Sequence, residues 1–452
     1  MGYPRQIMAN DILNFLEDLV REACAQGADE ADAVDIDSRS LEVAVRFGKI
    51  EHMERSEQRK TGLRVLVGRR QAVVATADRQ PETAAALVAR AIAMARAAPE
   101  DPHAGLAEQA LLAADWPELD LYDAIQPTSE DLTRKAIDAE AAALDVASIT
   151  NSEGASASRS ETRVALVSSN GFASSYRRSG CGLSVSVLAG EGTAMESGYD
   201  WSSAVHASDL AEPAALGRSA GARAVSRLGP VKPATAVMPV VFEQRLAGRV
   251  VSALAGAING AAVARGTSFL KDAMGEPVLK SGMSLVDDPS RPRGHGSRPF
   301  DAEGLRCRRC ALVEGGVLRA WLLDLRSARQ LGLPPAGHAS RSPGSAPSPA
   351  SSNLYLAPGP LPPDDMIGEI ENGLFVTALM GHGVDLVAGR YSQGAAGFAI
   401  RGGKIAEPVS EITIAGDLRE MLLGLDAAND LVFRGTVNAP TLRVEAMTVG
   451  GR

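Results

Sequence analysis

A helix-breaking segment, GPVKP at residues 229–233, divides the sequence into two parts with different secondary-structure patterns. Its two prolines remove two backbone donors and fix φ, so neither a helix nor a central strand can run through it. Helix and strand signals alternate before it, and short strands and turns dominate after it. A chain of 452 residues is long enough for two hydrophobic cores. We therefore predict an N-terminal domain over residues 1–228, a linker over 229–236 and a C-terminal domain over 237–452.

The N-terminal part is predicted to be an α+β domain, a mixed sheet with flanking helices. Apolar residues recur at helical spacing after Asn10, which can cap that helix, and Gly27 ends it. Alternating apolar and polar residues indicate strands that pair antiparallel. The expected strands cover residues 41–47, 63–67, 71–75, 163–169 and 182–188. The other expected helices cover residues 81–98, 129–144 and 210–228.

The C-terminal part is predicted to be strand-rich, either barrel-like or a twisted sheet, and to contain one helix of small residues. That helix is expected over residues 244–264, directly after a short apolar strand at 237–242. Residues 334–353 are rich in Pro, Ser, Gly and Ala and are expected to form a long loop. Only residues 417–429 read as a further helix in the tail.

The charge balance excludes two classes of binding protein. The chain has 46 Lys and Arg against 55 Asp and Glu, a formal net charge of −9. A nucleic-acid binder needs an excess of basic residues, and so does a protein held on an anionic membrane surface. We therefore expect neither a nucleic acid nor a membrane among the partners.

The cysteines and the apolar runs indicate a cytoplasmic protein. Four cysteines are too few for a disulfide scaffold and suit a reducing compartment. Charged residues interrupt the first 17 residues, which therefore lack the apolar core of a signal peptide. The longest weakly polar run, residues 250–264, is shorter than the roughly 20 residues of a membrane-spanning helix.

Few side chains suggest chemistry by themselves. Cys307 and Cys310 form the single CxxC, without the second pair of a zinc site. Strand alternation over 304–324 would place them on opposite faces, which favours two structural thiols over a metal or redox site. His382, between two glycines and near Tyr391, is a possible general base or ligand contact, with a structural histidine as the alternative.

Arg298 lies in a short GHGSR segment at residues 294–298 that reads as a turn, because it matches no phosphate-binding motif. We interpret it first as a residue that fixes a loop through ion pairs and second as a substrate clamp.

Nine ordered segments resemble the TldD/PmbA family, also called the modulator of DNA gyrase family, and specifically its PmbA (TldE) branch. They are NSEG at 151–154, TSFL at 267–270, GSRPFD at 296–301, SARQLG at 327–332, ASR at 339–341, NLYL at 353–356, LMGHGV at 379–384, YSQGAAGF at 391–398 and PVSEITIAG at 408–416. The match is dense in the C-terminal part and sparse in the N-terminal part.

This resemblance implies a cytoplasmic subunit that pairs with a TldD-like subunit to form a zinc metalloprotease for peptide precursors and labile proteins. In the TldD-type subunit a helix carries HExxxH, which binds zinc and activates water, and a cysteine near the C-terminus adds a ligand. Here the three corresponding positions are Val251, Ser252 and Gly256, and no cysteine follows Cys310. The resemblance thus implies a non-catalytic subunit without its own cofactor, with zinc in the partner.

For this subunit we expect contacts with an extended peptide or with the partner at His382, Arg298 or Tyr391, and a homodimer is possible when the chain is alone. Two other functions stay open. One is a stand-alone metallopeptidase with metal on Cys307, Cys310 and His382. The other is a non-enzymatic protein that regulates gyrase or an antitoxin.

Overall fold

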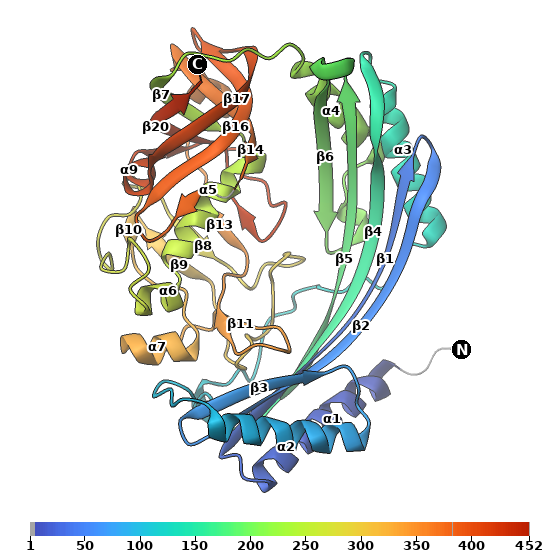
Figure 1. The fold of residues 1–452 in the computed structure, drawn as a ribbon, viewed down its shortest axis with the longest axis vertical. Coiled ribbons are helices and arrows are strands. Elements are labelled where there is room, and N and C mark those ends of the chain that lie inside the picture. The colour runs from blue at the N-terminus through green and yellow to red at the C-terminus, as the bar shows by residue number, and fades with distance from the viewer. Residues whose placement is uncertain (1–4, 382, 452) are drawn as a thin grey trace.

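The computed structural model describes residues 5–381 and 383–451, with side chains from Asp11 onward (Figure 1). A large sheet of long, curved strands forms one side of the molecule, and a barrel lies opposite its upper end. All neighbouring strands of the large sheet are antiparallel. In spatial order they are β3 (Arg70–Thr76), β2 (Lys49–Val67), β1 (Glu30–Arg46), β4 (Ile149–Ser168), β5 (Ala173–Ala189) and β6 (Glu196–Ala204).

Four helices cover the outer face of this sheet in two pairs. Residues alternate between the two faces of a strand, so Ala31, Ala33, Val43 and Val45 of β1 all point to the outer face. The first two of these residues pack under one helix pair, and the last two pack under the other. The pairs are α1 (Arg5–Ala25) with α2 (Pro81–Ala97), and α3 (Ser129–Leu144) with α4 (Pro213–Ser226).

The inner face of the large sheet packs against the C-terminal part of the chain. Val34, Leu166 and Phe172 form an apolar cluster with Phe300, whose ring meets that of Phe172 at 4.9 Å. A Cβ on Gly62 of β2 would lie 1.8 Å from the carbonyl oxygen of Pro343, so the chain approaches the sheet as closely as glycine permits.

The barrel is closed by five strands around the largest hydrophobic core. Its closure comes from the pairing of β14 with both β7 and β16. The strands, in order, are β14 (Asn372–Met380), β7 (Ala236–Phe242), β20 (Leu442–Gly450), β17 (Lys404–Asp417) and β16 (Arg390–Arg401); β15 (Val384–Asp385) and β18 (Leu425–Ala427) attach to it. Helix α5 (Gln244–Ala257) packs its apolar face into this core.

A loop-rich region joins the barrel to the inner face of the large sheet. Its small sheet has the order β10 (Val317–Leu318), β9 (Cys310–Glu314), β8 (Leu285–Asp287), β13 (Leu354–Leu356) and β19 (Val437–Asn438). The remaining elements are β11 (Ala339–Ser340), β12 (Ser348–Pro349), α6 (Gly260–Ala264), α7 (Leu325–Leu331), α8 (Pro363–Gly368) and α9 (Leu418–Leu423). The loop expected over 334–353 contains only β11 and β12 as regular structure.

The α+β class and the barrel-like C-terminal part are confirmed, and the predicted mixed sheet is antiparallel. The domain boundaries at 228 and 237 stay a prediction. No helix within residues 5–381 and 383–451 combines the length and the apolar content that crossing a membrane requires.

Three predicted elements were wrong in detail. The first helix begins at Arg5 rather than after Asn10. The helix expected over 244–264 is interrupted because Asn259 caps a new helix, its side chain accepting from the Ala261 N–H at 3.0 Å. Helix α9 is shorter than the predicted 417–429, since the chain turns into β18.

Candidate functional site

Helix α5 occupies the place where the family resemblance puts a zinc-binding helix, and its three key positions carry no ligand. Val251 is buried in the barrel core. Ser252 is exposed, and its hydroxyl donates to the Gly248 carbonyl of its own helix at 2.9 Å. A Cβ at Gly256 would lie 2.7 Å from Cδ1 of Leu386, so any side chain at this position would have to displace the end of Leu386. None of the three can ligate zinc or act as a general base.

The exposed side of α5 is bordered by the segment that follows β14. The Arg249 guanidinium donates to the Leu379 carbonyl at 3.4 Å, and Leu386 lies against Gly256. Two apolar side chains of this segment face solvent, Met380 with 53% and Val387 with 64% of its surface exposed. The predicted contact residue His382 lies in the same segment but outside the described residues.

Tyr391 lies in the barrel core instead of at the surface. Its side chain is 1% exposed, and its ring meets that of Phe242 edge-on at 6.4 Å. Burial raises the pKa of its phenol. The hydroxyl has no hydrogen-bond partner among the described residues. A peptide cannot reach this side chain from outside in this conformation, so its predicted contact role has no support from the geometry.

Arg298 is a buried residue that ties loops together. Its guanidinium donates to the carbonyls of Ala339 and Ala350 at 3.2 and 3.3 Å. The charge of Arg298 also acts on the thiol of Cys307 in the same loop-rich region. This geometry agrees with the loop-fixing interpretation, whereas a contact between Arg298 and a peptide stays a prediction.

Cys307 and Cys310 are partly buried. Cys307 donates weakly to the Gly337 carbonyl at 3.4 Å, and burial raises the pKa of its thiol to about 12. Burial also raises the pKa of Cys310. Cys307 lies before β9, which begins only at Cys310, so the single continuous strand predicted over both residues was wrong. Within the described residues, no three His, Cys, Asp or Glu side chains gather closely enough to hold a metal ion.

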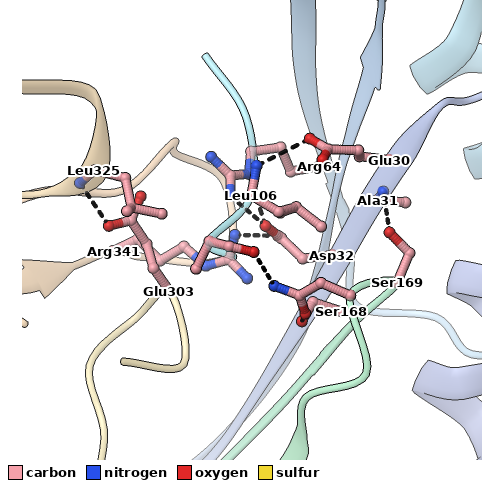
Figure 2. Close-up of polar contacts among 12 residues, drawn as sticks. Glu30, Ala31, Asp32, Arg64, Leu106, Ser168, Ser169, Glu303, Leu325 and Arg341 are labelled. Atoms are coloured by element: carbon pink, nitrogen blue, oxygen red, sulfur yellow. Dashed lines mark hydrogen bonds and ion pairs between the residues drawn. The ribbon is translucent and has the colours of Figure 1, made fainter. Parts of the chain in front are cut away.

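A buried ionic cluster connects the large sheet to the loop-rich region, and the sequence did not reveal it (Figure 2). The Arg64 guanidinium of β2 donates to Asp32 of β1 through Nε at 2.8 Å. Arg341, which follows β11, donates to the other carboxylate oxygen of Asp32. All three side chains are 4% exposed or less. Burial by itself would raise the pKa of Asp32, but the charges of Arg341 and Arg64 hold it below its usual range.

Two more carboxyl groups, Asp301 and Glu303, lie next to this cluster and share a proton. Asp301 accepts three backbone hydrogen bonds, from Glu303 and Leu305 at 2.8 and 2.9 Å and from Ala339 at 3.1 Å. Burial raises the pKa of Asp301, although the charge of Arg298 and these three donors favour its charged form. Burial and the Asp301 charge raise the pKa of Glu303 to about 8, so Glu303 holds the proton at neutral pH.

The only sequence signal for this region was the family motifs themselves. Arg341 ends the ASR segment, and Asp301 and Glu303 lie in or beside the GSRPFD segment. Asp32 lies in a stretch whose charged residues interrupt the apolar alternation, so the sequence did not predict the start of β1. No local pattern connects residues that are so far apart in the chain.

Comparison with protein families gives matches over most of the sequence. Residues 34–95, 122–228 and 235–451 match domain 1, the central domain and the C-terminal domain of the PmbA/TldA metallopeptidases. The matched ranges leave the connecting segment before residue 235 and the stretch 96–121 between them.

Similar proteins cover almost the whole chain. Metalloprotease PmbA of Escherichia coli O157:H7 is 34% identical over 97% of this chain and 96% of its own length. A PmbA homologue of Haemophilus influenzae is 34% identical over 91% of this chain and 90% of its own.

Solved structures agree with the sequence relatives. A candidate modulator of DNA gyrase from Bacteroides thetaiotaomicron superposes with a TM-score of 0.89 at 25% identity, over 97% of this chain and 98% of that one. TldE from Thermococcus kodakarensis shares the fold, with a TM-score of 0.87 at 19% identity over 97% and 100%. This chain therefore belongs to the PmbA/TldD family of metallopeptidases.

Proposed function

We propose that this chain is the non-catalytic subunit of a cytoplasmic two-subunit zinc metalloprotease that cleaves peptide precursors and labile proteins. Its partner is a TldD-like subunit that holds the zinc. The observation that carries this proposal is the chemistry of α5, where Val251, Ser252 and Gly256 stand at the positions of two ligands and a general base. A zinc peptidase needs imidazole or carboxylate ligands and a base beside the bound water, and these three side chains supply neither.

The surface beside α5 is the partner interface in this proposal. Met380 and Val387 expose apolar surface in the segment that contacts α5 at Arg249 and Gly256, and Ser252 lies exposed on the helix between these two residues. Matches to TldD homologues among the curated relatives indicate that the family includes both subunit types.

The sheet edges limit where an extended peptide can be held by strand addition. Three outward carbonyls of β6 are already occupied by side chains of this chain. Arg227 donates to Ser197 at 2.9 Å, Arg245 donates to Tyr199 at 3.1 Å, and His295 lies 3.1 Å from the Ser203 oxygen. A peptide at β6 would have to displace these groups. We therefore assign strand addition to the opposite side of the large sheet, where residues 49–60 of β2 pair only with β1.

The cytoplasmic location rests on the thiols. All four cysteines are free in the structure, and two of the four have thiols whose pKa is raised by burial within the loop-rich region. A chain with unpaired cysteines suits a reducing compartment.

Peptidase activity and bound zinc test the proposed role directly. The chain is purified alone, and separately with the TldD-like protein of the same cell, and each sample is given an unfolded peptide. We expect no zinc and no cleavage for the chain alone, and cleavage for the mixture. Stoichiometric zinc together with cleavage by the chain alone would contradict the proposal and return attention to Cys307, Cys310 and His382.

The interface is tested by Ser252→Arg. Arginine has a better helix propensity than serine and the site is exposed, so the fold should be unaffected. A long charged side chain beside Met380 and Val387 should instead weaken association with the TldD-like subunit by at least about tenfold. Association is measured by titration and size-exclusion chromatography. The matched control is Ala89→Arg on the exposed side of α2, at the other end of the molecule. Equal association of both variants would place the interface elsewhere.

A further inference from the structure

A large cleft crosses the outer face of the large sheet between the two helix pairs. It has a volume of about 1010 Å³. Helices α1 and α2 cover one end of the long strands and α3 and α4 cover the other, which leaves the middle of this face without a helix (Figure 1). Five arginines line the cleft, and we call it the arginine cleft: Arg39, Arg59, Arg79, Arg163 and Arg177.

The strand register places these arginines in adjacent rows. One row across the sheet reads Arg59, Asp37, Arg163 and Arg177, on β2, β1, β4 and β5. Arg163 and Arg177 are thus directly opposite each other, an arrangement of like charges that destabilises a sheet. In the next row, Arg39 faces Glu161.

The carboxylates of the sheet neutralise the arginines only in part. Asp37 is shared by Arg59 at 3.2 Å and Arg163 at 3.3 Å. Arg79 binds Asp35, and Arg177 binds Glu161. On the floor of the cleft, five guanidinium groups therefore meet three carboxylates, and Asp11, Glu118 and Asp120 add three more carboxylates at its mouth.

Arg39 differs from the other four arginines of the cleft in its interactions. It is exposed, and it makes no hydrogen bond or ion pair with any described residue. Arg39 lies opposite Glu57 and Glu161 in the strand register, but these carboxylates pair with Arg55 and Arg177. The Arg39 guanidinium is available to a ligand.

The mouth of the cleft carries acidic side chains, whereas its floor on the sheet carries the arginines. Asp11, Glu118 and Asp120 lie at the mouth, and Asp120 is bound by Arg293 from outside the cleft at 2.6 Å. Acidic groups at the mouth repel every anion in proportion to its charge, so a bound anion must gain its affinity from direct contact with the arginines of the floor. The ring of Trp116, 39% exposed, also lines the cleft.

We propose that the arginine cleft binds a small molecule that carries two or more linked phosphate groups. Guanidinium groups match phosphate oxygens in bidentate geometry. Neighbouring strands lie about 5 Å apart, and alternate residues of one strand about 7 Å apart, so several arginines reach one phosphate chain. Such a ligand would relieve the repulsion between Arg163 and Arg177. This inference does not depend on α5, which carries the proposed protease subunit, although Arg59 of the cleft lies in the β2 segment assigned to peptide binding.

Binding is measured on the full chain alone by calorimetry and by the shift in Tm, with inorganic tripolyphosphate and ATP as probes and citrate as a carboxylate control. We expect tripolyphosphate to bind and raise Tm, and Arg39→Gln and Arg163→Gln each to weaken its binding by about tenfold or more. Tighter binding of ATP than of tripolyphosphate would assign the cleft to nucleotides, with the base on Trp116. Weaker binding of ATP would assign it to the phosphate chain only.

The variants also separate binding from folding. Arg39→Gln removes no contact among the described residues. Arg163→Gln removes a like-charge neighbour of Arg177 together with the ion pair to Asp37, which keeps Arg59 as a partner. Both ligand-free proteins should therefore keep the wild-type Tm within a few degrees. Arg90→Gln, exposed on α2 and outside the cleft, is the matched control and should bind as the wild type does. The proposal is overturned if neither probe binds, if citrate binds as tightly as tripolyphosphate, or if Arg90→Gln weakens binding equally.

Discussion

Replacing Asp32 by asparagine should reduce the free energy of unfolding by about 3–5 kcal/mol, because it leaves two buried guanidinium groups without a counter-charge. Arg64 and Arg341 both donate to this carboxylate, and all three side chains are almost fully buried. Asparagine has nearly the same shape, so the loss comes from charge rather than from a cavity. Urea unfolding followed by circular dichroism gives the change.

A triple variant distinguishes lost charge pairing from lost packing. Replacing Asp32, Arg64 and Arg341 together by Leu, Met and Met removes all three buried charges, and stability should return to within about 2 kcal/mol of the wild type. The matched control is Asp18→Asn, whose ion pair with Arg21 is about 70% exposed on both sides and should matter by less than about 1 kcal/mol. An Asp32→Asn protein as stable as this control would disprove the role of the cluster.

Asp32 and Arg341 also come from different parts of the chain, the large sheet and the loop-rich region (Figure 2). Breaking their contact should therefore loosen the loop around residues 339–350 before the sheet unfolds. Limited proteolysis should cut this loop sooner in Asp32→Asn than in the wild type.

Local sequence signals were sufficient where the stabilising groups are close in the chain. Helix α3 spans the predicted 129–144 because Thr128 and Asp131 form a capping box and alanines repeat on its buried face. The early half of β1 was missed because Asp32, Asp35 and Asp37 interrupt its apolar pattern. Their arginine and threonine partners lie on other strands, which no local window contains.

Edge position explains a second omission. Strand β6 has no apolar alternation, since its side chains serve an exposed edge whose carbonyls are bound by Arg227, Arg245 and His295. The prediction of a continuous helix over 244–264 was wrong for the opposite reason. The apolar pattern continues through Asn259, although the side chain of Asn259 caps a new helix.

The candidate site was predictable only through the family motifs. They identified positions 251, 252 and 256, and the structure adds that Val251 is core and that Ser252 faces solvent. The arginine cleft had no such signal. Four of its arginines come from four strands and Arg79 precedes α2, and only the register of those strands places Arg163 opposite Arg177.

A pH dependence of stability should come from Glu303. The folded protein keeps its proton up to about pH 8, because burial and the neighbouring Asp301 raise the pKa of Glu303, whereas a glutamate in the unfolded chain releases its proton near pH 4.3, roughly. The folded state therefore binds more protons than the unfolded state between these values. Stability is highest below the lower pKa and falls as pH rises toward about 8.

Glu303→Gln should remove this loss, because glutamine is a neutral isostere of the protonated acid and its carbonyl oxygen can still accept from the Leu325 N–H, now at 2.8 Å. At pH 5 the variant and the wild type should unfold at similar urea concentrations. At pH 9 the variant should be more stable, by an amount on the order of a few kcal/mol. Glu17→Gln, at an exposed position of α1, should show no such crossover. A wild-type protein whose stability relative to Glu303→Gln is the same at pH 5 and pH 9 would show that the pKa of Glu303 is not raised in the folded protein.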